Sequence, residues 1–77
     1  MFDRKLFAAR VRNRRLELGI GVRELARQLD VVPSAIAQYE DGNALPALGN
    51  LVSLADALNC STDYLLGRVM DRYDTKP

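Results

Sequence analysis

The sequence predicts a single all-α domain built from five short helices. Its 77 residues leave room for one compact domain with one hydrophobic core. In successive segments, apolar residues recur at the spacings of three and four that amphipathic helices show. Residues that commonly end helices separate these segments, at Gly19, Asp30, Gly42 and Gly67. We expect the domain to occupy residues 1–67, followed by a tail over residues 68–77.

The composition fits a soluble globular protein, with 48% apolar and 27% charged residues. No apolar run approaches the roughly 18 residues that a membrane span needs. The N-terminal segment contains Asp3 and lacks the apolar region of a secretory signal, so we expect a cytoplasmic protein without membrane contact. One cysteine and no histidine argue against an internal disulfide and a zinc site. Cys60 is interpreted as a small core residue.

The net charge is only +1, but the charge is unevenly distributed along the chain. Residues 1–29 carry a net charge of +5, and residues 30–77 carry −4. The first part contains eight basic residues, which are Arg4, Lys5, Arg10, Arg12, Arg14, Arg15, Arg23 and Arg27. The small total argues weakly against a nucleic-acid partner, but the distribution matters more.

The first helix is expected from about Arg4 to Leu18, with Asp3 as its N-cap and Gly19 as the residue that ends it. Its predicted core stripe consists of Phe7, Val11 and Leu18. At about 100° per residue, Arg14 also falls on this stripe. We therefore expect its aliphatic stem to cover the edge of the core while its guanidinium reaches solvent or an acid.

A tight turn is expected to join a second helix, over residues 22–29, to a third helix, over residues 33–41. Their predicted buried residues are Leu25, Ala26, Leu29, Ile36 and Tyr39. Asp30 can take the left-handed conformation that ends a helix. Val32 occupies the N-cap position of the third helix, where the lack of an acceptor should cost roughly 0.5–2 kcal/mol. The outward face of that helix consists of Pro33, Ser34, Ala37, Gln38 and Asp41.

A fourth helix is expected over residues 47–58 and a short fifth helix over residues 62–66. The fourth helix should close the core with Leu48, Leu51, Leu54, Ala55 and Leu58. Ser61 is a suitable N-cap for the fifth helix, which Leu65 and Leu66 should dock. In the tail, the spacing of Val69, Met70 and Tyr73 fits another amphipathic turn or two, a partner contact, or a frayed end.

Four segments of this chain together resemble the Cro and C1 repressor type of helix-turn-helix proteins, the XRE-like family that includes lambdoid phage repressors. They are RVRNRRLELGIGVRELA (residues 10–26), IAQYEDG (36–42), LVSLADAL (51–58) and STDYLLG (61–67). The resemblance covers about residues 6–67 and implies a five-helix fold like that of the lambda repressor. In this family, an arginine late in the first helix commonly pairs with a glutamate near the end of the third. Arg15 and Glu40 occupy those positions, which implies a structural ion pair.

The resemblance further implies that the third helix reads double-stranded DNA in the major groove. By carry-over, the base-contacting residues are Pro33, Ser34, Ala37 and Gln38. The implied phosphate contacts are Arg10, Arg12, Arg23, Arg27 and Asn43. This chain departs from the family at Gly21 and Val22, where a Ser or Thr followed by Gln usually holds a phosphate. It also has Asn43 and Ala44 where the family commonly places Lys or Arg.

The sequence favours one of three functions. The leading hypothesis is a transcriptional regulator, a repressor, that binds a palindromic operator as a homodimer in the cytoplasm, at the nucleoid, without cofactor or small-molecule substrate. Its predicted dimer contacts are Leu66, Val69, Met70 and Tyr73. The alternative is a protein-interaction module with the same fold, such as an antirepressor or a regulatory partner. An enzyme is disfavoured, because the sequence has no histidine, no Gly-rich phosphate loop and no paired carboxylates in an evident pocket.

Overall fold

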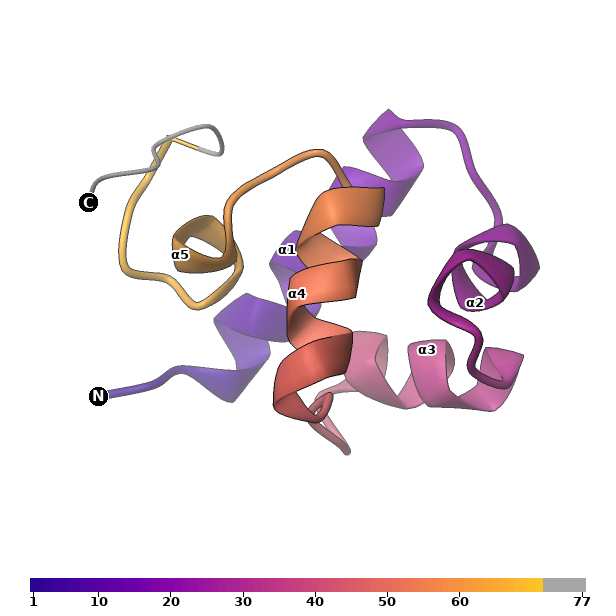
Figure 1. Ribbon diagram of the computed structural model, residues 1–77. Helices are drawn as coiled ribbons and strands as arrows, with labels where there is room; N and C mark the ends of the chain where they lie inside the picture. Colours follow the sequence, from indigo (N-terminus) through magenta and orange to yellow (C-terminus); the bar gives the residue numbers. More distant parts are fainter. Residues whose placement is uncertain (72–77) are drawn as a thin grey trace.

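The computed structural model describes residues 1–71, and these residues form five α-helices without a strand. The helices are α1 (Arg4–Glu17), α2 (Val22–Leu29), α3 (Pro33–Asp41), α4 (Leu48–Ala57) and α5 (Thr62–Leu65) (Figure 1). The five-helix prediction is therefore confirmed, and each predicted boundary lies within one residue of the observed one. Among residues 1–71, no helix has the length and apolarity needed to cross a bilayer.

The helix ends follow from local hydrogen bonding and backbone conformation. The Asp3 carboxylate accepts a hydrogen bond from the Leu6 amide at 3.0 Å, and the Ser61 hydroxyl accepts one from the Tyr64 amide at 3.0 Å. Both side chains satisfy amides that have no partner within their helices. At the end of α2, Asp30 is left-handed, with φ 56° and ψ 45°, as predicted. Val32 begins α3 with no side-chain cap, also as predicted.

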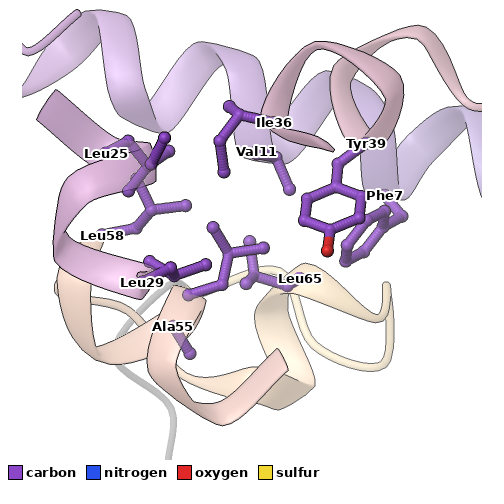
Figure 2. Close-up of a cluster of buried hydrophobic side chains, with 11 residues drawn as sticks. Phe7, Val11, Leu25, Leu29, Ile36, Tyr39, Ala55, Leu58 and Leu65 are labelled. Carbon is purple, nitrogen blue, oxygen red and sulfur yellow. The ribbon is translucent and has the colours of Figure 1, made fainter. Parts of the chain in front are cut away.

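One hydrophobic core lies between the helices, and all five contribute to it (Figure 2). Its buried members are Phe7, Val11, Leu25, Ala26, Leu29, Ile36, Tyr39, Leu54, Ala55, Leu58 and Leu65. Cys60 packs against this cluster but is only partly buried. The short helices α2 and α3 are thus stabilised by burial in a shared core, since helices of this length are marginal in isolation.

Two predicted core residues lie outside the core. Leu18 is 38% exposed, because α1 ends at Glu17 and the turn that follows packs Ile20 against the core instead. Leu48 is 78% exposed at the first position of α4. One turn later Leu51 is only partly buried, so α4 extends beyond the edge of the core at its N-terminal end. Periodicity alone does not show where the surrounding helices stop covering a stripe.

The packing leaves the outer face of α3 uncovered. α3 packs against both α1 and α2, α4 packs against α2 and α5, and α1 also contacts α5. In Figure 1, α1 runs behind α4, α5 lies to the left, and α3 lies at the bottom of the view. The turn over residues 30–32 therefore presents α3 at one edge of the molecule, with its inner face held by two helices.

Candidate nucleic-acid interface

The outer face of α3 carries the residues that were predicted to point outward. Pro33, Ser34, Ala37, Gln38 and Asp41 are all exposed. The opposite face is closed, since Ile36 is completely buried and Tyr39 is 6% exposed. Val32, just before the helix, adds an apolar side chain that is 63% exposed. Half of these six exposed residues are therefore apolar, and Gln38 is the one with an amide side chain.

An ion pair fixes α3 to α1. The Arg15 Nε atom donates to Glu40 Oε2 at 2.6 Å, and Arg15 Nη2 donates to Glu40 Oε1 at 3.0 Å. The side chains are only 12% and 8% exposed. The hydrogen bond to Glu40 raises the pKa of Arg15 above its ordinary value; burial opposes this shift, and the charge of Glu40 adds to it. The pair implied by the family resemblance is therefore present, with two parallel hydrogen bonds.

The same arginine also fixes the start of the helix-turn-helix unit. Arg15 Nη1 donates to the Ile20 carbonyl oxygen at 3.1 Å. Ile20 lies two residues before α2, so one guanidinium connects α1, the entry to α2 and the last turn of α3. This arrangement orients the outer face of α3 relative to the rest of the domain.

Arg10, implied as a phosphate contact, lies inside the protein. It is 8% exposed, and its Nη1 donates to the carbonyl oxygens of Tyr64 at 2.6 Å and Val69 at 2.8 Å. Its Cζ lies 4.2 Å from the centre of the Tyr64 ring. The side of α1 that carries Arg10 faces α5, and this contact was not visible in the sequence pattern. A phosphate contact by Arg10 does not fit this burial, and we leave Arg10 out of the interface.

Arg14 also serves the fold. Its side chain lies on the buried stripe, as predicted, and the residue is 6% exposed. Nε donates to the Leu58 carbonyl oxygen at 2.8 Å, and Nη1 contacts Glu17 Oε1 at 3.1 Å. Its guanidinium thus reaches both an acid and the C-terminal end of α4, where unpaired carbonyl groups favour a cation.

The two implied phosphate contacts on α2 differ in their surroundings. Arg27 pairs with Glu24 on the same helix, and Gln28 donates to the other carboxylate oxygen of Glu24 at 3.0 Å. The hydrogen bond from Gln28 lowers the pKa of Glu24 below its ordinary value; burial opposes this shift, and the charge and hydrogen bond of Arg27 add to it. Arg23 is exposed and forms no ion pair within the described residues. Of Arg23 and Arg27, only Arg27 is therefore held in an ion pair within the described residues.

The N-terminal turn of α1 lies close to the loop that follows α3. Asn43 is exposed, and its backbone amide donates to the Gln38 carbonyl oxygen at 3.0 Å. Arg4 Nη1 donates to the Gly42 carbonyl oxygen at 3.3 Å. Arg4 and Lys5 were not predicted as site residues from the sequence, because this contact joins segments 38 residues apart. Arg12 is exposed on α1.

Known proteins have a similar sequence and fold. Residues 11–65, most of the chain, match a family model described as helix-turn-helix. The chain belongs to the helix-turn-helix family. Its resemblance to the Cro and C1 repressor type is confirmed. It is 40% identical over 62 residues to Repressor protein C2 of Salmonella phage P22, a match that covers 80% of this chain and 29% of that protein.

Two further curated relatives are regulators as well. The helix-turn-helix chain is 36% identical over 59 residues to the transcriptional repressor RstR of the cryptic phage CTXphi from Vibrio cholerae, covering 77% of this chain and 53% of the repressor. It is 34% identical over 68 residues to the HTH-type transcriptional regulator DicA of Escherichia coli, covering 88% and 50%. The chain thus spans about half or less of the length of these curated relatives.

Solved structures confirm the fold of this helix-turn-helix domain as that of the lambda repressor type. The crystal structure of the P22 c2 repressor with a synthetic operator matches with a TM-score of 0.79 and 38% identity, covering 82% of this chain and 96% of the other. A hypothetical transcription factor from Neisseria, NHTF, matches with a TM-score of 0.75 and 30% identity, covering 82% and 72%.

Three of the predicted dimer contacts, Leu66, Val69 and Met70, lie within the described residues and do not share one helical face. Leu66 caps the end of α5 and is partly buried, as is Val69. Met70 is 86% exposed. Residues 68–71 are not helical, so the amphipathic extension considered from the sequence does not occur there. Tyr73 lies outside the described residues.

Proposed function

We propose that the chain is a sequence-specific, double-stranded DNA-binding transcriptional repressor that places α3 in the major groove. The observation that carries this proposal is the uncovered outer face of α3, which the Arg15–Glu40 pair orients relative to the domain. Support comes from the P22 c2 repressor, whose similar domain was solved with operator DNA. We further propose a cytoplasmic, nucleoid-associated location without a small-molecule substrate.

Base recognition is assigned to the exposed residues of α3. The Gln38 amide suits a bidentate contact with the N6 and N7 atoms of adenine. The Ser34 hydroxyl can bond a base or a phosphate, and Ala37 or Pro33 can lie against a thymine methyl group. Each good bidentate pair contributes roughly 1–3 kcal/mol of discrimination, so Gln38 is the principal determinant of base choice in this proposal.

Phosphate contacts are assigned to Arg12, Arg23 and Asn43, which are exposed. Arg27 can join them by leaving Glu24, because that ion pair lies on the surface of α2, where such pairs are worth little. In the dimeric complex, two copies of α3 would lie about 34 Å apart on a palindromic site. We assign the dimer contact to the surface that includes Leu66, Val69 and Met70.

The test is selection of a duplex from a random pool, followed by fluorescence titration of the selected palindrome at two salt concentrations. We expect saturable binding that weakens with salt, and a loss of adenine preference in Gln38→Ala. Absence of saturable binding to any selected duplex would reject the proposal. Sedimentation with and without the duplex tests the dimer, and a monomer under both conditions at high concentration would reject it.

A second candidate function is a protein-interaction module with little DNA affinity. The observations that favour it are the apolar face of α3, the acid Asp41 on that face, and the start of α2 at Gly21, which makes no side-chain cap. The variant with Ser34→Ala, Gln38→Ala and Arg23→Ala separates the two functions. A repressor loses tight, salt-dependent binding in this variant, whereas an interaction module shows unchanged DNA affinity.

A further inference from the structure

Arg4 and Lys5 lie in the first turn of α1, beside the C-terminal end of α3. Both residues are exposed. Arg4 Nη1 donates to the Gly42 carbonyl oxygen at 3.3 Å, and the Arg4 Cγ atom would lie 3.8 Å from a Cβ atom built on Gly42. A shallow surface groove is lined by residues 1–5 and 41–43, which include both cations and the acids Asp3 and Asp41. The two cations are thus held next to the loop that follows α3.

The fold accounts for Arg4 only in part, through its bond to the Gly42 carbonyl oxygen, and it does not account for Lys5. The N-terminal end of a helix carries partial positive charge, so cations in the first turn are electrostatically unfavourable for α1. Within residues 1–71, neither Arg4 nor Lys5 forms an ion pair. The bond to Gly42 occupies one N–H of the Arg4 guanidinium, which carries five, and its Nε and Nη2 make no hydrogen bond in the described part of the chain.

The loop after α3 lacks the basic residues that commonly contact phosphate in this family. Residues 43–47 are Asn, Ala, Leu, Pro and Ala. Arg4 and Lys5 bring positive charge to the same place from another part of the chain. Arg23 provides a cation on α2, the other helix that packs against α3.

We propose that Arg4 and Lys5 form a phosphate-binding site for one strand of the DNA, while Arg23 serves the other strand. The site rests on the proposed function. A helix in the major groove has a phosphate backbone on each side, and the groove is about 12 Å wide. Arg4 presents a planar guanidinium that suits phosphate oxygens, and Lys5 adds a mobile ammonium group. These contacts position α3 without reading sequence.

The test compares Arg4→Gln/Lys5→Gln with the unmodified chain on a selected duplex. Each lost phosphate contact reduces the slope of log K against log salt by about 0.9, so the double variant should show a slope shallower by about 1.8 per bound subunit, or about 3.6 for the proposed dimer. Between 50 and 200 mM salt, the affinity of the variant should therefore fall less than that of the unmodified chain, by about tenfold per bound subunit and about 150-fold for the dimer. Base preference should be unchanged. Ethylation of the contacted phosphates should weaken binding of the unmodified chain but not of the variant.

The matched control is Ser53→Asp/Asn59→Asp, which changes the net charge equally at exposed positions on α4 and just after it. We expect its salt slope to equal that of the unmodified chain. Thermal unfolding of both variants verifies that they are folded. Equal slopes for all three proteins would overturn the Arg4–Lys5 site while leaving the proposed function intact. If the unmodified chain binds no duplex, both proposals are rejected.

Discussion

Arg15 and Glu40 place opposite charges in a largely dry environment between α1 and α3. Removing both from water costs several kcal/mol for each ion, and the two parallel hydrogen bonds offset this cost. The third bond, from Arg15 Nη1 to the Ile20 carbonyl oxygen, uses a further donor of the guanidinium. Each partner is therefore satisfied only while the other is present.

Removing one partner should strongly destabilise the protein. We expect Arg15→Met or Glu40→Leu to lower the free energy of unfolding by about 3–5 kcal/mol, because the remaining charge is buried without compensation. The double variant Arg15→Met/Glu40→Leu should lose less than the sum of the two. Urea denaturation at neutral pH measures all three values, and single variants that lose under 1 kcal/mol would contradict the interpretation.

Glu24 provides a test of local electrostatics on α2. Its pKa is lowered chiefly by the hydrogen bond from Gln28, so Gln28→Ala should raise it toward its ordinary value in an NMR titration. Because the folded-state pKa is the lower one, the unfolded chain binds more protons in acid. Glu24 thus stabilises the folded protein fully at pH values above the ordinary carboxyl pKa of about 4. This stabilisation is lost as the pH falls through the lowered pKa. If the pKa of Glu24 is the same in Gln28→Ala as in the unmodified chain, the hydrogen bond from Gln28 is not its cause.

At the scale of elements, α3 combines a closed inner face with an unprotected start. Val32 has φ −74° and ψ 149°, the extended conformation of an N-cap, and its carbonyl oxygen accepts a hydrogen bond from the Ala35 amide at 3.0 Å, but its side chain offers no acceptor to α3. Pro33 at the first helical position removes one of those unpaired amides. The first turn of α3 therefore lacks a side-chain cap.

A better cap should stabilise α3. We expect Val32→Ser to raise the free energy of unfolding by about 1 kcal/mol, since the hydroxyl can accept an amide hydrogen bond and little apolar burial is lost at a largely exposed position. The control is Asp3→Ala, which removes an existing cap from α1 and should lower stability by a similar amount. Chemical denaturation gives both values, and a destabilised Val32→Ser would show that the valine side chain packs usefully.

At the scale of the whole molecule, Arg10 connects α1 to α5 and to the segment after it. We expect Arg10→Met to lower the free energy of unfolding by about 2–4 kcal/mol, because two partly buried carbonyl groups lose a charged donor. Hydrogen exchange should increase first in residues 62–71. In folded protein, the salt slope of DNA binding should match that of the unmodified chain, because the buried Arg10 side chain does not fit a phosphate contact. A shallower slope would restore Arg10 to the interface.

The helices could be predicted from the sequence because their signals are local. Asp3, Ser61, Pro33 and the glycines mark helix ends, and the apolar spacing marks the core of α2 and α3. The outer face of α3 followed directly from the same periodicity. Leu48 was misplaced because the edge of the core depends on where the neighbouring helices stop.

The roles of the arginines could not be predicted from the residues themselves. Arg10, Arg12 and Arg15 lie within six positions on one helix, yet they are respectively buried against α5, exposed, and paired with α3. Their partners are distant in sequence, so no local pattern distinguishes them. The family resemblance supplied the Arg15–Glu40 pair, but it also implied a phosphate contact for Arg10. The structure added Arg4 and Lys5 beside α3.

The contacts of Arg10 and Leu65 also constrain how the chain can fold while it is being synthesised. Leu65 is completely buried, and Arg10 bonds the Val69 carbonyl oxygen, 59 positions further along the chain. Until Val69 has left the ribosome, α1 lacks these partners, although α2, α3 and α4 have already emerged. The helix-turn-helix unit is therefore made early, but the core that holds it rigid closes only when nearly all of the described chain is available.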